Sequence, residues 1–408
     1  MEIRSLTYFA QPGDPIRDDV LKRSTEFADS ARNHFEKAGF PVQTLRFAAP
    51  PYPTELQSLE KSAVVDYAAA LEEKTASAGF DYLSLGPALP DFLESYLVIP
   101  EIIQATEQVF CSGLMTREDG SVDLPAVRAC AEVIYSLGPQ DPDGFANLFF
   151  TASANVPPGA PFFPAAYHGS GKETMAIAVE GADLALEAFS SASSFAQARA
   201  ALIKKLEHTG KKLQDAAEQL TQPMDLEFGG IDFSLAPFPE EQKSIGAALE
   251  ALGLPSLGQH GSTAAAAFLA DTIDQARFPR TGFSGLMLPV LEDSILALRG
   301  AQGSLGVKDL LLYSAVCGTG LDTIPLPGDL NPEQISAVLF DLAALALRLD
   351  KPLTARLMPI PGGQIGQRTQ FDFPYFANSR ILELDAEPLQ GLFQGNESLV
   401  IKPRHPMK

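Results

Sequence analysis

The sequence contains few of the residues that mark a secreted or a nucleic-acid-binding protein. Tryptophan is absent. The three cysteines are scattered with no C-x-x-C spacing, so we expect no disulfide framework and a reducing compartment. Basic residues are outnumbered: 30 Lys and Arg face 51 Asp and Glu, which gives a net charge of −21. A chain this acidic repels phosphate backbones and anionic headgroups, so we expect no nucleic-acid and no membrane partner.

Long apolar runs are also missing. The best run, at residues 336–349, is interrupted by Asp341, and no run approaches the length that spans a bilayer. The N-terminal residues carry an early acid and no apolar core. We therefore expect no signal peptide and a soluble, cytoplasmic protein. No linker rich in Pro, Gly or Ser divides the chain, so residues 1–408 are predicted to form a single domain.

The sequence does contain the material of a large α/β core. Hydrophobic residues make up 46% of the chain, enough to build and bury a core. Short apolar runs alternate with amphipathic stretches, beginning with a predicted strand at 2–9 and a predicted helix at 17–38. We count about ten apolar runs, the number that a large closed or doubly wound α/β sheet uses.

Several element boundaries can be predicted from local residues. Asn331 is the expected N-cap of a helix, followed by Pro at the first helical position and a capping-box Gln. Thr54 is predicted to cap a long helix. Residues 182–220 are expected to be helical with a break near 191–194, and 285–290 (GLMLPV) is predicted as a buried strand.

Two loops contain histidines in unusual settings. His168 lies in a turn of small residues before a predicted strand, and His260 lies between glycines directly before a predicted helix. We expect Ser262 or Thr263 to cap that helix, and its free N–H groups, with those near Gly261, would bind an anion. His260, and with it His168, would then serve as acid/base groups. The alternative is a local hydrogen bond within a glycine turn.

Two further loops combine carboxylates with a thiol. Glu292 and Asp293 end an apolar run, the position where α/β active sites usually lie. Cys317, Asp322 and Asp329 share one stretch rich in Gly and Pro. Cys317 would be a nucleophile or hydrogen donor. Asp293 and Asp322 would orient groups or, with Glu292, bind a divalent cation. The alternatives are a helix N-cap for Asp293 and a turn position for Asp329.

The expected ligand-binding set also includes charged residues outside these loops. Lys172 and Arg356 are the natural cationic partners of an anionic ligand, with a surface ion pair as the alternative for both. Asp232, in the stretch GGIDFSLAP, is expected either to pair within the sheet or to line the site. Asp329 completes this set.

Ordered motifs between Asp232 and Pro361 carry a resemblance to a known family. They stand at 232–237 (DFSLAP), 260–265 (HGSTAA), 291–293 (LED), 315–322 (AVCGTGLD), 326–329 (LPGD) and 356–362 (RLMPIPG). In these motifs the sequence resembles the bacterial and archaeal domain-of-unknown-function family 711, and weaker matches extend toward both ends of the chain.

The resemblance implies a barrel similar to that of pyruvate formate-lyase-type glycyl radical enzymes. In those enzymes a cysteine loop enters the barrel and meets a C-terminal glycyl radical loop. Residues 361–380 do not match the Arg-Val-x-Gly radical loop, so glycyl radical chemistry is not expected. The family has no established reaction, and the resemblance therefore leaves the function open.

We expect an enzyme that acts on a small anionic or amide-bearing metabolite at one mouth of the barrel. The alternative is a non-catalytic metabolite-binding or regulatory protein. A metal-free site is favoured over a divalent-cation site because the histidines lack His-x-x-x-His spacing. A homodimer is expected from the frequency of dimers among such proteins.

Overall fold

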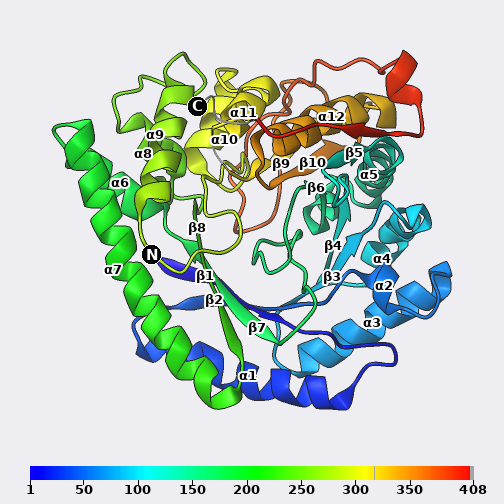
Figure 1. Cartoon of the computed structure of the whole chain (residues 1–408). Helices are drawn as coiled ribbons and strands as arrows, with labels where there is room; N and C mark the ends of the chain where they lie inside the picture. Colours follow the sequence, from blue (N-terminus) through cyan, green and yellow to red (C-terminus); the bar gives the residue numbers. More distant parts are fainter. Residues whose placement is uncertain (317, 405–408) are drawn as a thin grey trace.

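A mixed β-sheet organises the computed structural model, which describes residues 1–316 and 318–404 (Figure 1). Nine strands of the described chain form it in the order β8-β7-β1-β2-β3-β4-β6-β10-β9. Their bounds are β1 Glu2–Phe9, β2 Val42–Ala48, β3 Tyr82–Ala88, β4 Val109–Leu114, β6 Phe150–Ala154, β7 Thr174–Glu180, β8 Glu227–Ala236, β9 Gly320–Pro327 and β10 Leu353–Ile360. The α/β class predicted from the sequence is confirmed.

The strands run in two opposite sets. Strands β1, β2, β3, β4 and β6 pair in parallel. Strands β7 and β8 are parallel to each other and antiparallel to β1, while β9 and β10 are parallel to each other and antiparallel to β6. Two antiparallel seams therefore join a central parallel set to a parallel pair on each side.

The two edge strands, β8 and β9, approach the same irregular segment at residues 279–291. The Met287 amide donates to the Ser234 carbonyl of β8 (3.1 Å), and the Val290 amide donates to the Asp322 carbonyl of β9 (3.0 Å). Isolated parallel bridges join this segment to both strands. The predicted strand at 285–290 is thus buried but irregular, because Pro289 cannot donate to a ladder and Ser284 has a φ of +40°. In the described chain the regular sheet is open here, and the predicted ten-stranded barrel is not confirmed.

Figure 1 shows the helices on the outside of the curved sheet, with coil between β6 and β7 running inside it. The helices are α1 Asp18–Lys37, α2 Tyr52–Glu55, α3 Lys61–Ser77, α4 Ile99–Ala105, α5 Leu124–Leu137, α6 Ala182–Ser190, α7 Phe195–Thr221, α8 Ile245–Glu250, α9 Ser262–Gln275, α10 Ser294–Gln302, α11 Val307–Ser314 and α12 Pro332–Leu349. Two short strands, β5 Ser121–Asp123 and β11 Ser398–Val400, pair separately. None of the helices in the described residues is long and apolar enough to cross a membrane.

Local rules located some helix boundaries correctly and others not. Asn331 caps α12 with its side chain, within a capping box, as predicted. Ser194 caps α7 at the predicted break between α6 and α7. The prediction for Thr54 is wrong: its hydroxyl donates to the Pro51 carbonyl inside the short helix α2. The backbone turns extended at Leu56, so α3 starts separately.

The sheet buries both of its faces, but with different residues. On β8, Ile231, Phe233 and Leu235 pack in the main apolar core. Asp232 and Ser234 alternate with them and are also buried, on the opposite face of the strand. Buried polar residues on the inner face require partners there, which draws attention to the space that this face encloses.

Candidate functional site

A small cavity of about 90 Å³ lies against the inner face of the sheet; we call it the inner cavity. Strands from both halves of the sheet line it together with three coils. Its charged and polar lining residues are Arg4, Gln43, Thr44, Arg46, Tyr82, Asp232, Ser234, Glu292, Arg356 and Tyr375. The apolar remainder consists of Phe110, Leu148, Pro161, Phe162, Phe163, Ala178, Val179, Ala236, Met287 and Phe373. Arginines are mostly exposed in proteins, so one buried arginine (Arg356) and two partly buried ones (Arg4 and Arg46) around one small space are the feature to explain.

Two of these arginines belong to a buried ion network. Arg356 of β10 donates from Nε to Asp322 Oδ1 (2.6 Å) and from Nη2 to Glu292 Oε1 (2.8 Å). Arg4 of β1 donates to the other Glu292 oxygen. The side chains of Arg356, Glu292 and Asp322 are 5%, 4% and 1% exposed. Charges this deeply buried need paired, hydrogen-bonded partners, and this network supplies them for Glu292.

The environments of the two carboxyl groups in the network differ. Burial opposes ionisation of Glu292, but the guanidinium groups of Arg4 and Arg356 lower its pKa overall. For Asp322 burial prevails and raises the pKa despite the contact with Arg356. Asp322 Oδ2 is buried and has no hydrogen-bond partner among the described residues.

Arg46 of β2 differs from the other two arginines because no ion pair with a carboxylate is present for it in the described chain. Its Nε donates to Thr44 Oγ1 (2.9 Å). The guanidinium lies 5.6 Å from the ring centroid of Tyr82 and 5.1 Å from that of Phe163. Burial, followed by repulsion from Arg4, lowers its pKa to about 9. Arg46 is therefore a cation in the cavity wall with aromatic neighbours and no direct ion pair in the described part of the chain.

Asp232 lines the inner cavity and also holds its wall in place. The carboxylate accepts hydrogen bonds from Ser234 Oγ (2.5 Å), from the Phe283 amide (2.9 Å) and from the Ser284 amide (3.0 Å). Gly282 has a φ of +62°, and a Cβ there would lie 2.2 Å from Asp232 Oδ2. Burial raises the Asp232 pKa despite these donors. Asp232 thus lines the inner cavity, while its hydrogen bonds fix segment 279–291.

Asp293 is a helix N-cap, which is the alternative that its position in the sequence left open. Its Oδ1 accepts from the Ile295 and Leu296 amides (both 2.9 Å) and so caps α10. Its Oδ2 accepts from the Ile245 amide (2.6 Å) at the start of α8. It is fully buried and absent from the cavity wall. One carboxylate therefore joins two helix N-termini.

The His260 loop lies away from the inner cavity. His260 is exposed. Gly261, with a φ of +106°, is the N-cap of α9. The predicted cap by Ser262 or Thr263 is wrong: the Ser262 hydroxyl instead donates to the Gln259 carbonyl (2.7 Å). Thr263 is the second residue of α9 and provides no side-chain cap.

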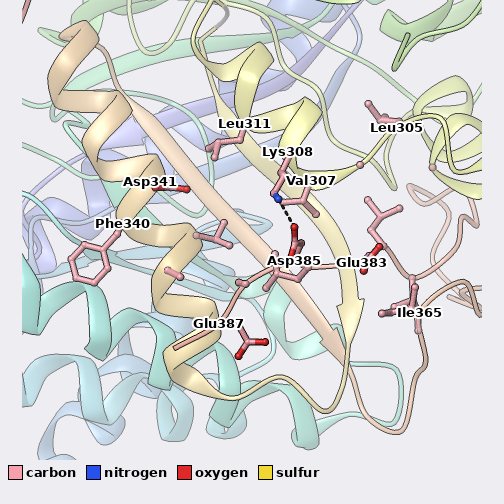
Figure 2. A pocket seen from close by; sticks show the side chains of 18 of the residues that line it. Leu305, Val307, Lys308, Leu311, Phe340, Asp341, Ile365, Glu383, Asp385 and Glu387 are labelled. Atoms are coloured by element: carbon pink, nitrogen blue, oxygen red, sulfur yellow. Dashed lines mark hydrogen bonds and ion pairs between the residues drawn. The ribbon is translucent and has the colours of Figure 1, made fainter. Parts of the chain in front are cut away.

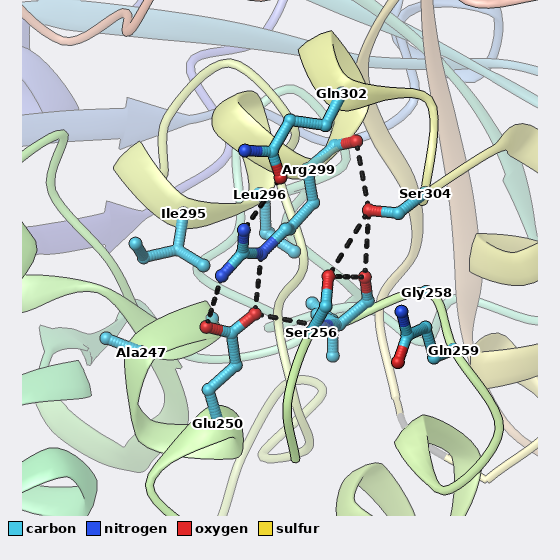
Figure 3. A network of polar contacts seen from close by, with 12 residues as sticks. Ala247, Glu250, Ser256, Gly258, Gln259, Ile295, Leu296, Arg299, Gln302 and Ser304 are labelled. Carbon is cyan, nitrogen blue, oxygen red and sulfur yellow. Dashed lines mark hydrogen bonds and ion pairs between the residues drawn. The ribbon is translucent and has the colours of Figure 1, made fainter.

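A polar network holds this loop against α10 (Figure 3). Arg299 donates from Nε and Nη2 to the two oxygens of Glu250, both at 2.7 Å. Ser304 Oγ lies 3.5 Å from Ser256 Oγ. A Cβ on Gly258 would lie 1.8 Å from the Ser304 carbonyl oxygen. The loop conformation is therefore set by internal packing.

The other predicted site residues lie apart from the inner cavity. His168 is buried, its backbone amide donates to the Ala49 carbonyl (3.0 Å), and burial lowers its pKa. Lys172 forms a surface ion pair with Asp225 (2.5 Å). Asp329 is exposed in a turn before α12. Cys317 lies outside the described residues.

The predicted divalent-cation site has little support in the described part of the chain. No group of three or more His, Cys, Asp or Glu side chains there is placed to hold a metal. Glu292 and Asp322 face guanidinium groups and Asp293 faces backbone amides. The structure brings together Asp232, Glu292, Asp322 and Arg356 from the predicted set, in and around a cavity whose other two arginines, Arg4 and Arg46, were not predicted.

A larger cavity, of about 1110 Å³, lies between α10–α12 and residues 380–390; we call it the outer cavity (Figure 2). Apolar side chains such as Leu305 and Phe340 line much of it. Its ion pair, Lys308 with Asp385, is largely exposed. Exposed ion pairs contribute little, so the inner cavity has the more unusual chemistry.

Comparison with known proteins places this architecture among relatives of undefined activity. Residues 1–378 match the model of a family described as Uncharacterised ACR (DUF711). A UPF0210 protein of Pyrobaculum arsenaticum is 33% identical over 354 residues, covering 81% of this chain and 76% of the relative. UPF0210 proteins of Clostridium perfringens (27% identical, covering 88% and 83%) and Methanopyrus kandleri (29% identical, covering 86% and 82%) are also similar.

Proposed function

This chain belongs to the uncharacterised DUF711 family, and we propose that it binds a small carboxylic acid in the inner cavity through the guanidinium of Arg46. The observation that carries the proposal is the charge of Arg46, partly buried in the cavity wall and without a direct ion pair among the described residues. A guanidinium presents parallel N–H donors that match the two oxygens of a carboxylate. A bound carboxylate would supply both the missing charge and the missing acceptors.

The dimensions of the inner cavity limit the size of the acid. An engineered cavity of about 150 Å³ in another protein accommodates benzene, whereas this one measures about 90 Å³. The acid is therefore smaller than benzene, with about two or three carbons. Ala178, Val179 and Met287 contribute apolar wall, which favours a short hydrocarbon body such as that of propionate.

We also propose that segment 279–291 acts as a tenth strand that closes the sheet into a barrel similar to the pyruvate formate-lyase fold. Its hydrogen bonds to β8 on one side and β9 on the other support this closure. The inner cavity would then be the barrel interior. The contribution of strands from both edges of the sheet to one small cavity agrees with this arrangement.

Catalysis at this site would depend on groups in the cavity wall. The predicted acid/base His260 is exposed and absent from the cavity lining, so it has less support than Glu292, which lines the cavity. Carboxylate binding is accordingly the proposed function, and turnover of the acid is the second step of the hypothesis.

A thermal-shift panel tests the binding. Acetate, propionate, lactate and pyruvate should raise the melting temperature, since a ligand at a hundred times its Kd adds about 2.7 kcal/mol. Neutral propionamide and the larger benzoate should not. Arg46→Met should abolish the shift, whereas His260→Ala and the matched surface variant Arg277→Met should retain it. A shift that survives Arg46→Met, or no shift with any acid, would refute the proposal.

A further inference from the structure

Two carboxyl groups share one edge of the Arg356 guanidinium. The Nε and Nη2 donors form the fork that ordinarily holds both oxygens of a single carboxylate. Here Nε contacts Asp322 Oδ1 (2.6 Å) and Nη2 contacts Glu292 Oε1 (2.8 Å). The two carboxyl groups must therefore lie side by side, and both are buried.

The remaining oxygens of the pair have unequal surroundings. Glu292 Oε2 accepts from Arg4, so both oxygens of Glu292 are paired with cations. Asp322 Oδ2 is buried without a hydrogen-bond partner in the described residues. A buried ionised oxygen with no donor is costly, whereas a protonated carboxyl removes the charge and gains an O–H donor.

We infer that Glu292 and Asp322 share a single proton, held mainly on Asp322, and form an acid–base pair of which Glu292 lines the inner cavity and Asp322 lies buried behind it. Like-charged carboxylates on one site cannot both ionise freely. A pair whose environments differ divides into an acid and a base. The inference deepens the proposed function, on which its catalytic meaning rests, because Glu292 lines the cavity that would hold the acid.

The charged groups around the pair agree with this division. Glu292 is influenced by Arg4, Arg356 and Arg46, and these guanidinium groups lower its pKa against the effect of burial. Asp322 is influenced by burial first, then by Arg356, Glu292 and Arg4, with a raised pKa as the result. Glu180 lies close enough to Arg4 to favour the charged form of that arginine.

The chemistry that follows is reversible proton transfer with a small acid. When the pair donates, the shared proton passes to the ligand through Glu292, which lines the cavity, and the pair gains one negative charge. When it accepts, the proton leaves a C–H or O–H bond of the ligand, whose electron pair stays on the ligand. Neither direction requires an oxidant, a reductant or another reactant.

The shared proton can be measured in the ligand-free protein. With aspartate labelled with ¹³C at the side-chain carboxyl carbon, NMR at pH 7 should show a protonated carboxyl signal that disappears in Asp322→Asn. The matched variant Asp329→Asn, in an exposed turn, should retain that signal. Asp322 found ionised at pH 7 in the wild type would overturn the inference.

A proton shared by Glu292 and Asp322 predicts a second result. In Glu292→Gln the competing negative charge is gone, so the pKa of Asp322 should fall relative to the wild type. An Asp322 pKa that is unchanged in this variant would reduce the effect to simple burial and overturn the pair. Should Glu292→Gln fail to fold, wild-type protein labelled on both residue types replaces it. The signals of Glu292 and Asp322 should then move in the same pH interval, and independent titration would contradict the inference. Because no ligand is present, failure of acids to bind would leave this result standing.

Discussion

The guanidinium of Arg46 lies over the ring of Phe163, 5.1 Å from its centroid. Phe163 belongs to the coil between β6 and β7, which enters the space enclosed by the sheet. A cation over an aromatic face is stabilised by the ring, but the ring carries no net negative charge that would neutralise it. The contact holds the side chain of Arg46 in the cavity wall and leaves its charge available to an anion.

Arg46→Met should stabilise the ligand-free protein. Replacing a partly buried charge that lacks a direct ion pair by an apolar side chain removes a desolvation cost, so the free energy of unfolding should rise, by on the order of 1 kcal/mol. Denaturant unfolding of wild type and variant measures the change. Destabilisation by more than about 2 kcal/mol would mean that Arg46 is a structural cation with a partner.

Arg356→Met should act in the opposite direction. It leaves Glu292 and Asp322 buried with one cation fewer, and breaking a buried pair on one side costs about 3–5 kcal/mol. Denaturant unfolding should show this loss, while the surface control Arg277→Met should stay within about 0.5 kcal/mol of wild type. An Arg356→Met protein as stable as the control would contradict the described network.

The pH dependence of stability should differ between wild type and Asp322→Asn. The raised pKa of Asp322 means that the folded state binds this proton more tightly than the unfolded state. The contribution of Asp322 is therefore fully present below the unfolded pKa of about 4 and is lost as the pH rises toward the folded pKa, by up to about 1.4 kcal/mol per pH unit. Denaturant unfolding from pH 4 to pH 8 should show this decline relative to Asp322→Asn. If the free energy of unfolding changed equally with pH in the two proteins, the raised pKa of Asp322 would be refuted.

Asp293→Ala should destabilise the protein without a direct effect on ligand binding. It removes the cap of α10 and the acceptor at the start of α8, and each lost cap costs about 1 kcal/mol. Asp329→Ala, in an exposed turn, is the control and should change stability by less than about 0.5 kcal/mol. If acid binding were lost while Asp293→Ala remained folded, Asp293 would have a role in the site that its contacts do not explain.

The sequence predicted the helices and strands well because their signals are local. Periodicity and caps locate α1, the break between α6 and α7, and the start of α12 at Asn331. Segment 279–291 was predicted to contain a regular strand because its apolar run resembles one. Its proline and its backbone turns interrupt the hydrogen-bond ladder, so the segment is irregular. Whether this segment completes a sheet depends on partners far away in the sequence.

The candidate site was only partly accessible from the sequence. Asp232, Glu292, Asp322 and Arg356 were identified because they stand in unusual loops or motifs, but Arg4 and Arg46 were not. The signal that was available is a basic residue inside a predicted strand, as in VQTLRFA of β2. The sequence does not show that Arg356 pairs with Glu292 while Arg46 forms no ion pair in the described residues, because both facts depend on three-dimensional contacts. The cytoplasmic location and the homodimer stay predictions.

Calorimetric titration of propionate into the wild-type protein and into Arg46→Met, at one pH and ionic strength, tests the central claim most directly. We predict one saturable site per chain in the wild type and no measurable binding by a folded Arg46→Met protein. Equal binding by both proteins, or no binding by the wild type to propionate or to any other two- or three-carbon acid, would contradict the assignment of the inner cavity as a carboxylate site.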